Sequence, residues 1–144
     1  MNPVKATKTI DYSKLNIGTE LECYLVHADS LQEITRAETQ LLFDELAVLG
    51  WKPVKRAVGA EIHAATKILA GFETEIKVDL CYAIFEIASR LPVASLATLE
   101  KIHAQSLFEL RHALAKQRMM IWPFGVAPAS SNLFRLPFTS REEL

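Results

Sequence analysis

The chain has few of the features that mark a specialised class of protein. It contains only two cysteines among 144 residues, and neither lies in a CxxC or CxxH pattern. This count favours free, buried thiols in a reducing compartment, with one structural disulfide as the alternative. No apolar run approaches the roughly 20 residues that a membrane-spanning helix needs. With 50% hydrophobic and 23% charged residues, the chain is expected to form one ordinary folded domain.

Charge and motif content exclude further classes of function. The formal net charge is −1 and the basic residues are scattered, so no positive field is available to attract nucleic acid. The N-terminus lacks the apolar core of a secretion signal, so a cytoplasmic protein with no membrane partner is expected. No GxxxxGK[ST] or GxGxxG motif is present. A bound nucleotide is therefore expected on the face of a sheet and not in a phosphate-binding loop.

The composition along the chain predicts three parts. Residues 1–16 form a polar lead-in, residues 17–128 form a single α+β domain, and residues 129–144 form an extended or flexible tail. The tail contains one proline and a serine pair, and it has no clear period. The folded part is expected to contain all the elements that bear on function.

The sequence of the first part of the domain predicts a strand followed by a helix. An aliphatic run at 17–26 reads as a strand and ends in a turn at 27–29. Ser30-Leu31-Gln32-Glu33 has the pattern of a capping box, with a hydroxyl at the cap and a carboxylate three residues later. Gly50 is expected to end the helix. The apolar positions of that helix recur at helical spacing: Ile34, Ala37, Leu41, Leu42, Leu46 and Leu49.

The middle of the chain predicts three strands joined by short turns. Segments rich in β-branched residues and alternating in character lie at 52–58, 61–68 and 72–77. Gly59 and Gly71 separate them and are expected at the turns. Consecutive strands with such short connections favour antiparallel pairing.

The last part of the domain predicts a strand, a long helix and a final strand. Residues 83–89 are expected to be a strand, with a short helix as the alternative because of their alanine content. Ser95 is suited to cap a helix that runs to about Gln117, and 119–124 reads as a strand closed by Gly125. The apolar stripe of the long helix consists of Leu96, Leu99, Ile102, Leu107, Leu110 and Leu114. The order of elements predicts an α+β fold with a mostly antiparallel sheet and two main helices packed on one face.

Two glutamates in the first strand are candidate functional residues. Because alternate side chains of a strand point to opposite faces, Glu20 and Glu22 share one face with Tyr24, while Leu21 and Cys23 share the other. Like charges side by side on a half-buried sheet repel each other, and a bound cation is the simplest remedy. A solvated sheet face is the alternative.

A third carboxylate lies in a strongly apolar run. Glu86 stands between Phe85 and Ile87, and a buried carboxylate without a partner is costly. A salt bridge to Lys77 or Arg90, or a place at the sheet edge, would explain Glu86 structurally. Taken with the glutamates of the first strand, it favours a site for a hard cation such as Mg²⁺, which prefers oxygen ligands and commonly bridges to nucleotide phosphates.

These acidic segments resemble those of a known enzyme family. The run 18–22, Gly-Thr-Glu-Leu-Glu, is similar to the GxExE strand that opens the glutamate–cysteine ligases and related carboxylate–amine ligases. Asp79 and Glu86 resemble the second acidic segment of that family, which ends in the pattern seen at 86–89. A long helix and the segment 121–128 follow in the family's order. The resemblance covers residues 17–128.

The resemblance implies a catalytic sheet like that of glutamine synthetase. In this family ATP and Mg²⁺ phosphorylate the γ-carboxylate of glutamate, and an amine such as that of cysteine then displaces the phosphate in glutathione biosynthesis. Carried over by motif, Glu20, Glu22, Asp79 and Glu86 would bind the metal ions and with them the nucleotide. Glu20, Glu22 and Glu86 would be the catalytic residues.

The sequence also departs from the family pattern. Tyr82 stands where many members have an acid, and Ala127 stands near a position where many have a histidine. Family members are much longer, so the chain is expected to correspond to their N-terminal portion, as a truncated form or fragment with a missing C-terminal half or as a reduced homologue. The alternative is a non-catalytic interaction module that forms homo-oligomers through an exposed strand edge.

Overall fold

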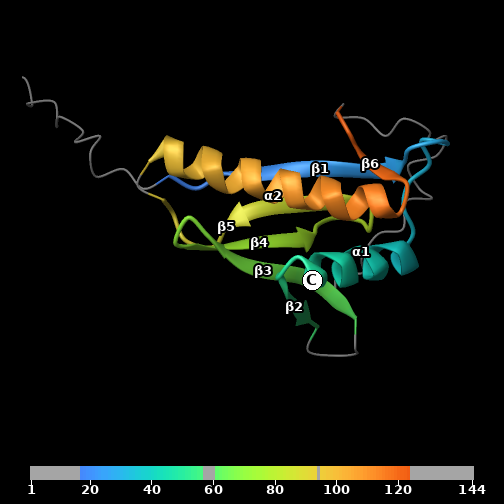
Figure 1. Ribbon diagram of the computed structural model, residues 1–144, viewed down its shortest axis with the longest axis horizontal. Helices are drawn as coiled ribbons and strands as arrows, with labels where there is room; N and C mark the ends of the chain where they lie inside the picture. The colour runs from blue at the N-terminus through green and yellow to red at the C-terminus, as the bar shows by residue number, and fades with distance from the viewer. Residues whose placement is uncertain (1–16, 57–60, 94, 124–144) are drawn as a thin grey trace, which may run out of the picture.

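A six-stranded antiparallel sheet and two helices make up the part of the chain that the computed structural model describes, residues 17–56, 61–93 and 95–123. The elements are β1 (Glu20–His27), α1 (Arg36–Val48), β2 (Lys52–Lys55), β3 (Ile62–Leu69), β4 (Phe72–Val78), β5 (Ile84–Ser89), α2 (Leu96–Lys116) and β6 (Met119–Trp122). The strand order is β2-β3-β4-β5-β1-β6 (Figure 1). The predicted α+β class is confirmed. The predicted lead-in and tail lie outside the described residues.

The first strand starts later than its sequence indicates, and the helix after it starts later still. Ile17 forms only an isolated bridge with Val93 before β1 begins. The capping box predicted at Ser30 is wrong, because α1 is capped by Thr35, whose hydroxyl accepts from the Glu38 amide while the Glu38 carboxylate accepts from the Thr35 amide. Both sites have the same sequence pattern.

Sheet pairing explains why the earlier capping pattern fails. Glu33 forms a β-bridge with Val26 of β1, and the His27 amide donates to the carbonyl of Gln32 at 2.8 Å. These bonds hold the segment extended along β1, so it cannot enter a helix. The helix ends as predicted, with Gly50 at φ 88°, a left-handed conformation that suits glycine.

The central hairpin and the long helix agree closely with expectation. Leu69 pairs with Phe72, so Ala70 and Gly71 form a two-residue turn, both with positive φ, as the tight turns of β-hairpins require. Ser95 caps α2, as predicted, by accepting from the Thr98 amide at 3.1 Å. Gly59 of the predicted loop, and the predicted end of β6 at Phe124 and Gly125, lie outside the described residues.

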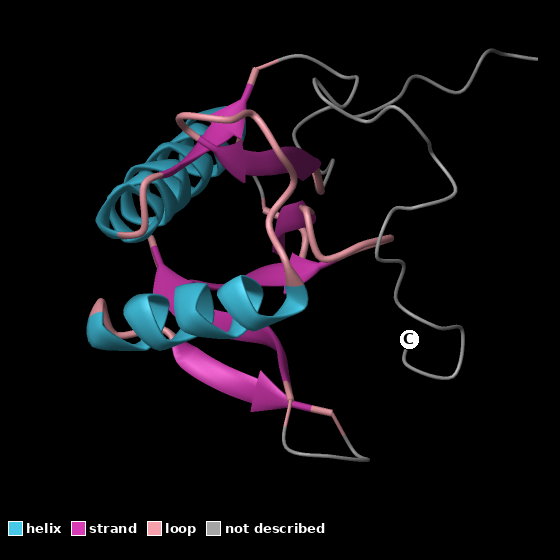
Figure 2. Ribbon diagram, turned by 90° about the vertical axis from the view of Figure 1, so that its right-hand side faces the viewer, coloured by secondary structure: helices cyan, strands magenta, loops and turns pink. Residues whose placement is uncertain are grey.

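The core lies between the two helices and one face of the sheet (Figure 2). The fully buried residues on that face include Leu25, Phe85 and Ile76, and both cysteines are buried as free thiols, as predicted. The predicted apolar stripes are wrong at three positions, since Ala37 is exposed, Leu41 is 53% exposed and Leu96 is 67% exposed. The helix residues that do bury against the sheet are Leu42, Phe43, Leu46, Leu99, Ile102, Leu110 and Leu114.

A buried polar network ties α2 to the sheet. The Glu109 carboxylate accepts from the Trp51 indole at 2.6 Å, from the Lys67 ammonium at 2.8 Å and from the Gln105 amide. Lys67 also donates to the carbonyl of Leu49. Neither helix is long and apolar enough to cross a membrane.

The two edges of the sheet differ. At one edge, β2 contains Pro53 between two exposed lysines, a composition that discourages further strand pairing. At the other edge, the short strand β6 pairs only with residues Tyr24 to His27 of β1. Within the described ranges, nothing pairs with residues 20–23 of β1 on that side.

Candidate functional site

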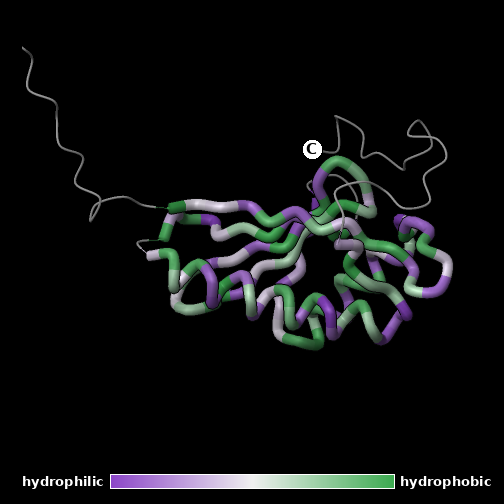
Figure 3. Tube along the Cα trace, turned by 90° about the horizontal axis from the view of Figure 1, so that it is seen from above, coloured by the Kyte–Doolittle hydropathy of each residue, from purple (hydrophilic) through white to green (hydrophobic). Residues whose placement is uncertain are grey.

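The sheet face opposite the helices is acidic, and we call it the open face. It carries Glu20, Glu22 and Tyr24 of β1, Ile84, Glu86 and Ala88 of β5, and Glu73, Glu75 and Lys77 of β4. Figure 3 shows the underlying alternation of hydrophilic and hydrophobic residues along the strands. The period of two in each strand sends the apolar set to the core and this polar set outward.

The two acidic segments found in the sequence meet on this face. Glu22 of β1 lies directly opposite Glu86 of β5. The Leu25 amide donates to the Ala83 carbonyl, so odd-numbered residues of β1 form the hydrogen-bonded pairs with β5. Glu22 and Glu86 therefore form a non-hydrogen-bonded pair, in which Cα atoms are about 4.5 Å apart and side chains approach closely. Two like charges in this arrangement destabilise the sheet.

Lys77 offsets part of this repulsion. Lys77 of β4 lies opposite Glu86 of β5, and its Nζ lies 2.9 Å from Oε1 of Glu86. Glu86 is only 6% exposed. The contact is an ion pair outside hydrogen-bond geometry. Burial alone would lower the pKa of Lys77, but the carboxylates of Glu86, Glu75 and Glu20 raise it overall. The salt bridge to Lys77 that the sequence offered as one explanation of Glu86 is therefore present.

The two glutamates of β1 add further negative charge to the open face. Glu20 and Glu22 are exposed and form no ion pair within the described part of the chain. Glu20 lies opposite Ala88, and Glu75 lies opposite the other side of Ala88, so the charge extends over three strands. Within β1, β5 and β4 the open face therefore carries five glutamates beside Lys77, and Arg90, which follows β5, pairs with one of them, Glu73.

The four predicted metal ligands do not gather at one point. The Asp79 amide donates to the Ile84 carbonyl, so Asp79 lies beside Ile84, two residues along β5 from Glu86. Glu20 lies beside Ala88, two residues from Glu86 in the opposite direction. From strand dimensions, the Cα atoms of Glu20 and Asp79 are roughly 17 Å apart. Among the described residues, no three His, Cys, Asp or Glu side chains form a metal-binding group. The central pair Glu22 and Glu86, with Glu20 beside it, is the part whose ligand type suits Mg²⁺.

The family position at Tyr82 has a structural role in this chain. Tyr82 is 6% exposed, its carbonyl accepts from the Thr39 hydroxyl at 3.1 Å, and the Arg36 guanidinium lies 5.8 Å from its ring centroid. Tyr82 lies in the turn before β5 and contacts α1, so a residue in this position does not add a carboxylate to the open face. Ala127, the other departure, lies outside the described residues.

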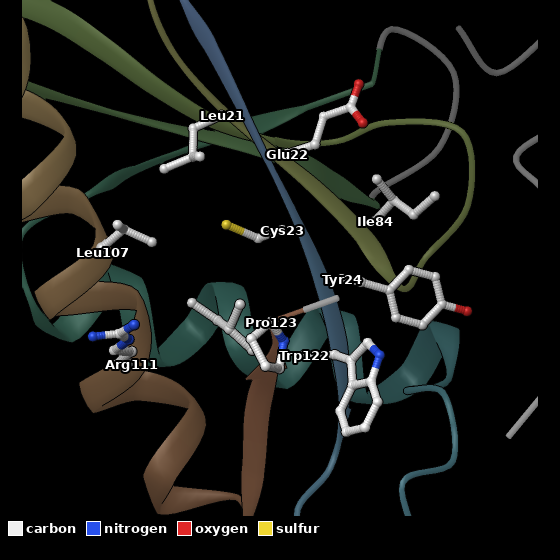
Figure 4. A pocket seen from close by; sticks show the side chains of 10 residues that line it. Leu21, Glu22, Cys23, Tyr24, Ile84, Leu107, Arg111, Trp122 and Pro123 are labelled. Atoms are coloured by element: carbon white, nitrogen blue, oxygen red, sulfur yellow. The ribbon is translucent and has the colours of Figure 1, made fainter. Parts of the chain in front are cut away.

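A groove that the sequence did not predict lies at the unpaired part of β1. Its volume is about 380 Å³ (Figure 4). Leu21, Cys23 and Leu107 line it on the helix side together with Arg111, and Trp122 closes it where β6 ends. Burial raises the pKa of the Cys23 thiol to about 11, although the Arg111 charge lowers it slightly. The groove depends on how far β6 extends, and no local pattern in the sequence reports that length.

Comparison of the sequence with protein-family models and with curated proteins gives no match.

Proposed function

We propose that the open face binds a divalent cation with a nucleotide and serves an ATP-dependent carboxylate–amine ligase of the glutamate–cysteine ligase type. The observation that carries the proposal is the cross-strand pair of Glu22 and Glu86. These residues come from the two separate segments that resemble the family's acidic motifs, and the sheet register brings them together. Like-charge pairs are unfavourable without a cation, so their placement favours a cation-binding role.

The residues around the pair would have separate tasks. Glu22, which is exposed, supplies a carboxylate that an ion can reach without desolvating the core. Glu86 is buried and held by Lys77, so it fixes the negative end of the site in place. A bound Mg²⁺ would supply charge neutralisation for phosphoryl oxygens. Glutamate and an amine such as cysteine are the substrates that the resemblance suggests.

The test is titration of Mg²⁺ and ADP against the full chain by calorimetry. Glu22→Gln and Glu86→Gln should each weaken binding at least tenfold, because each removes a charged oxygen ligand. Glu100→Gln is the matched control, since Glu100 is an exposed acid on α2, away from the open face. Binding that is absent, or that both substitutions leave unchanged, would refute a nucleotide site here.

A further inference from the structure

We propose that the unpaired edge of β1 binds an extended segment of another protein in which basic and apolar side chains alternate. This edge consists of residues 20–23 and the groove beside them. The inference concerns the backbone edge and the groove, and it does not depend on nucleotide binding. Strand addition to an exposed edge is a common mode of peptide recognition, in which main-chain bonds give affinity and alternate pockets give specificity.

The backbone of the edge is oriented for such pairing. The Leu25 amide donates to the Ala83 carbonyl on the β5 side of β1, and the Ala28 amide donates to the Arg118 carbonyl on the opposite side at 2.8 Å. The backbone N–H and C=O groups of successive strand residues point alternately to the two edges of the strand. Those of Glu20 and Glu22 therefore point toward the unpaired edge. A segment lying there would continue the sheet beyond the end of β6 and satisfy up to four of these groups.

The bound segment needs different side chains on the helix side of β1 and on the open face. On the helix side, the groove offers Leu21, Cys23 and Leu107 as apolar walls, and Arg111 there opposes a basic side chain. On the open face, the exposed carboxylates of Glu20 and Glu22 have no ion-pair partner within the described part of the chain and favour a basic residue beside them. Figure 4 shows Glu22 on the opposite side of β1 from Leu21, Cys23, Leu107 and Arg111. Alternation of apolar and basic residues satisfies both.

The same charges disfavour a second copy of the chain as the occupant. Antiparallel pairing of two β1 edges around a twofold axis places Glu20 or Glu22 of one copy opposite Glu20 or Glu22 of the other, in each of the registers centred on these residues. Such a contact would concentrate four carboxylates on one surface. A basic partner has no such cost.

Binding is measured with a fluorescein-labelled hexapeptide of alternating valine and lysine, by fluorescence anisotropy with the full chain in buffer containing EDTA. The alternating peptide should bind at least tenfold more tightly than a peptide of the same composition with its lysines in one block. It should also bind at least tenfold more tightly than an alternating valine–glutamate peptide. Equal binding of all three peptides, or none, would overturn the proposal.

Variants separate the edge from general charge attraction. The double change Glu20→Lys with Glu22→Lys should reverse the preference, so that the valine–glutamate peptide binds more tightly than the valine–lysine peptide. Leu107→Ala should weaken binding at least threefold, whereas Phe108→Ala should have no effect, because Phe108 is 68% exposed and does not line the groove. An equal effect of the two alanine variants would exclude the groove as the binding site.

Hydrogen exchange tests the free edge directly. In the free protein, the amides of Glu20 and Glu22 should exchange faster than those of Leu21 and Cys23, which face β5, and the lysine peptide should slow them. Protection of Glu20 and Glu22 in the free protein would mean that another part of the chain, or a second copy, already covers the edge. That result would overturn the proposal.

Discussion

Glu86 is a single residue on which both the stability of the sheet and the proposed cation site depend. It is buried on the open face, opposite Glu22 on one side and paired with Lys77 on the other. An ion pair of this kind costs desolvation, and breaking it from one side leaves a buried charge without a partner. The sequence identified Glu86 as unusual because it interrupts an apolar run, and it named Lys77 as one possible partner. Only the register decided between Lys77 and Arg90.

Lys77→Met tests this balance. The variant should lose about 1–3 kcal/mol of unfolding free energy in the absence of divalent ions, because the Glu86 carboxylate remains buried without its ammonium. Urea unfolding measures the loss. Lys101→Met, an exposed change on α2, is the control and should alter stability by less than about 0.5 kcal/mol. If Glu86 takes part in a cation site, Mg²⁺ should stabilise Lys77→Met more than the unmodified chain; equal stabilisation would argue against that role.

At the scale of elements, the start of α1 shows where local patterns lose to sheet pairing. The sequence offers two capping boxes five residues apart, and the one at Ser30 fails because its segment bonds to β1. The period of each element, the turn at Gly71 and the cap at Ser95 could be predicted, because the physical causes are local. The start of β1, the end of β6 and the exposed positions in the helices depend on neighbours far along the chain.

Substitution of the two hydroxyl residues distinguishes the caps. Thr35→Ala should cost about 1 kcal/mol of unfolding free energy, because it removes the side chain that accepts from the Glu38 amide. Ser30→Ala should cost at most about a few tenths of a kcal/mol, since Ser30 caps no helix and its hydroxyl accepts only a local bond from the Gln32 amide, whereas the Thr35 hydroxyl also donates to the Glu38 carboxylate at 2.8 Å. Chemical denaturation of both variants measures this. A larger effect at Ser30 would contradict the helix start described above.

The Glu109 network should make the contact of α2 with the sheet sensitive to acid. Burial would raise the pKa of Glu109, but hydrogen bonds from Lys67, Gln105 and Trp51 lower it below the ordinary value of 4.5. A carboxyl group with a lowered pKa contributes stability that is fully present above its ordinary value and is lost as the pH falls through the lowered one. Glu109→Gln should therefore cost about 1–3 kcal/mol near pH 7.

The difference between Glu109→Gln and the unmodified chain should shrink as the pH falls below about 4.5, because protonation then removes the same charge from the unmodified protein. Urea unfolding across a pH series measures the trend. Glu100→Gln, on the same helix and exposed, should show no comparable pH dependence. A cost that stays constant down to pH 3 would mean that packing, and not the carboxylate charge, accounts for the effect.

At the scale of the whole molecule, the sequence predicted the architecture better than the site. The α+β class with an antiparallel sheet followed from strand and helix periods and is confirmed. The common face of Glu20 and Glu22 followed from alternation alone. Their relation to Glu86 did not, because β1 and β5 are separated by three other strands and a helix in the chain. The register also spreads the four predicted ligands over β1, β5 and the turn after β4, and the edge groove lies where β6 ends at Trp122 within the described residues.

The charge on the β1 edge also leads to an expectation for the oligomeric state. Self-association through a strand edge is the alternative that the sequence offers, yet this edge carries Glu20 and Glu22, which would face their counterparts in such a pairing. At pH 7 and low salt, light scattering should therefore give the mass of a monomer. The double change Glu20→Gln with Glu22→Gln removes the repulsion and should shift the population toward dimers, because the edge retains its unpaired backbone groups. Glu100→Gln changes the net charge without altering the edge and should remain monomeric. Dimers of the unmodified chain, with the same affinity in the double variant, would show that a surface other than this edge joins the copies.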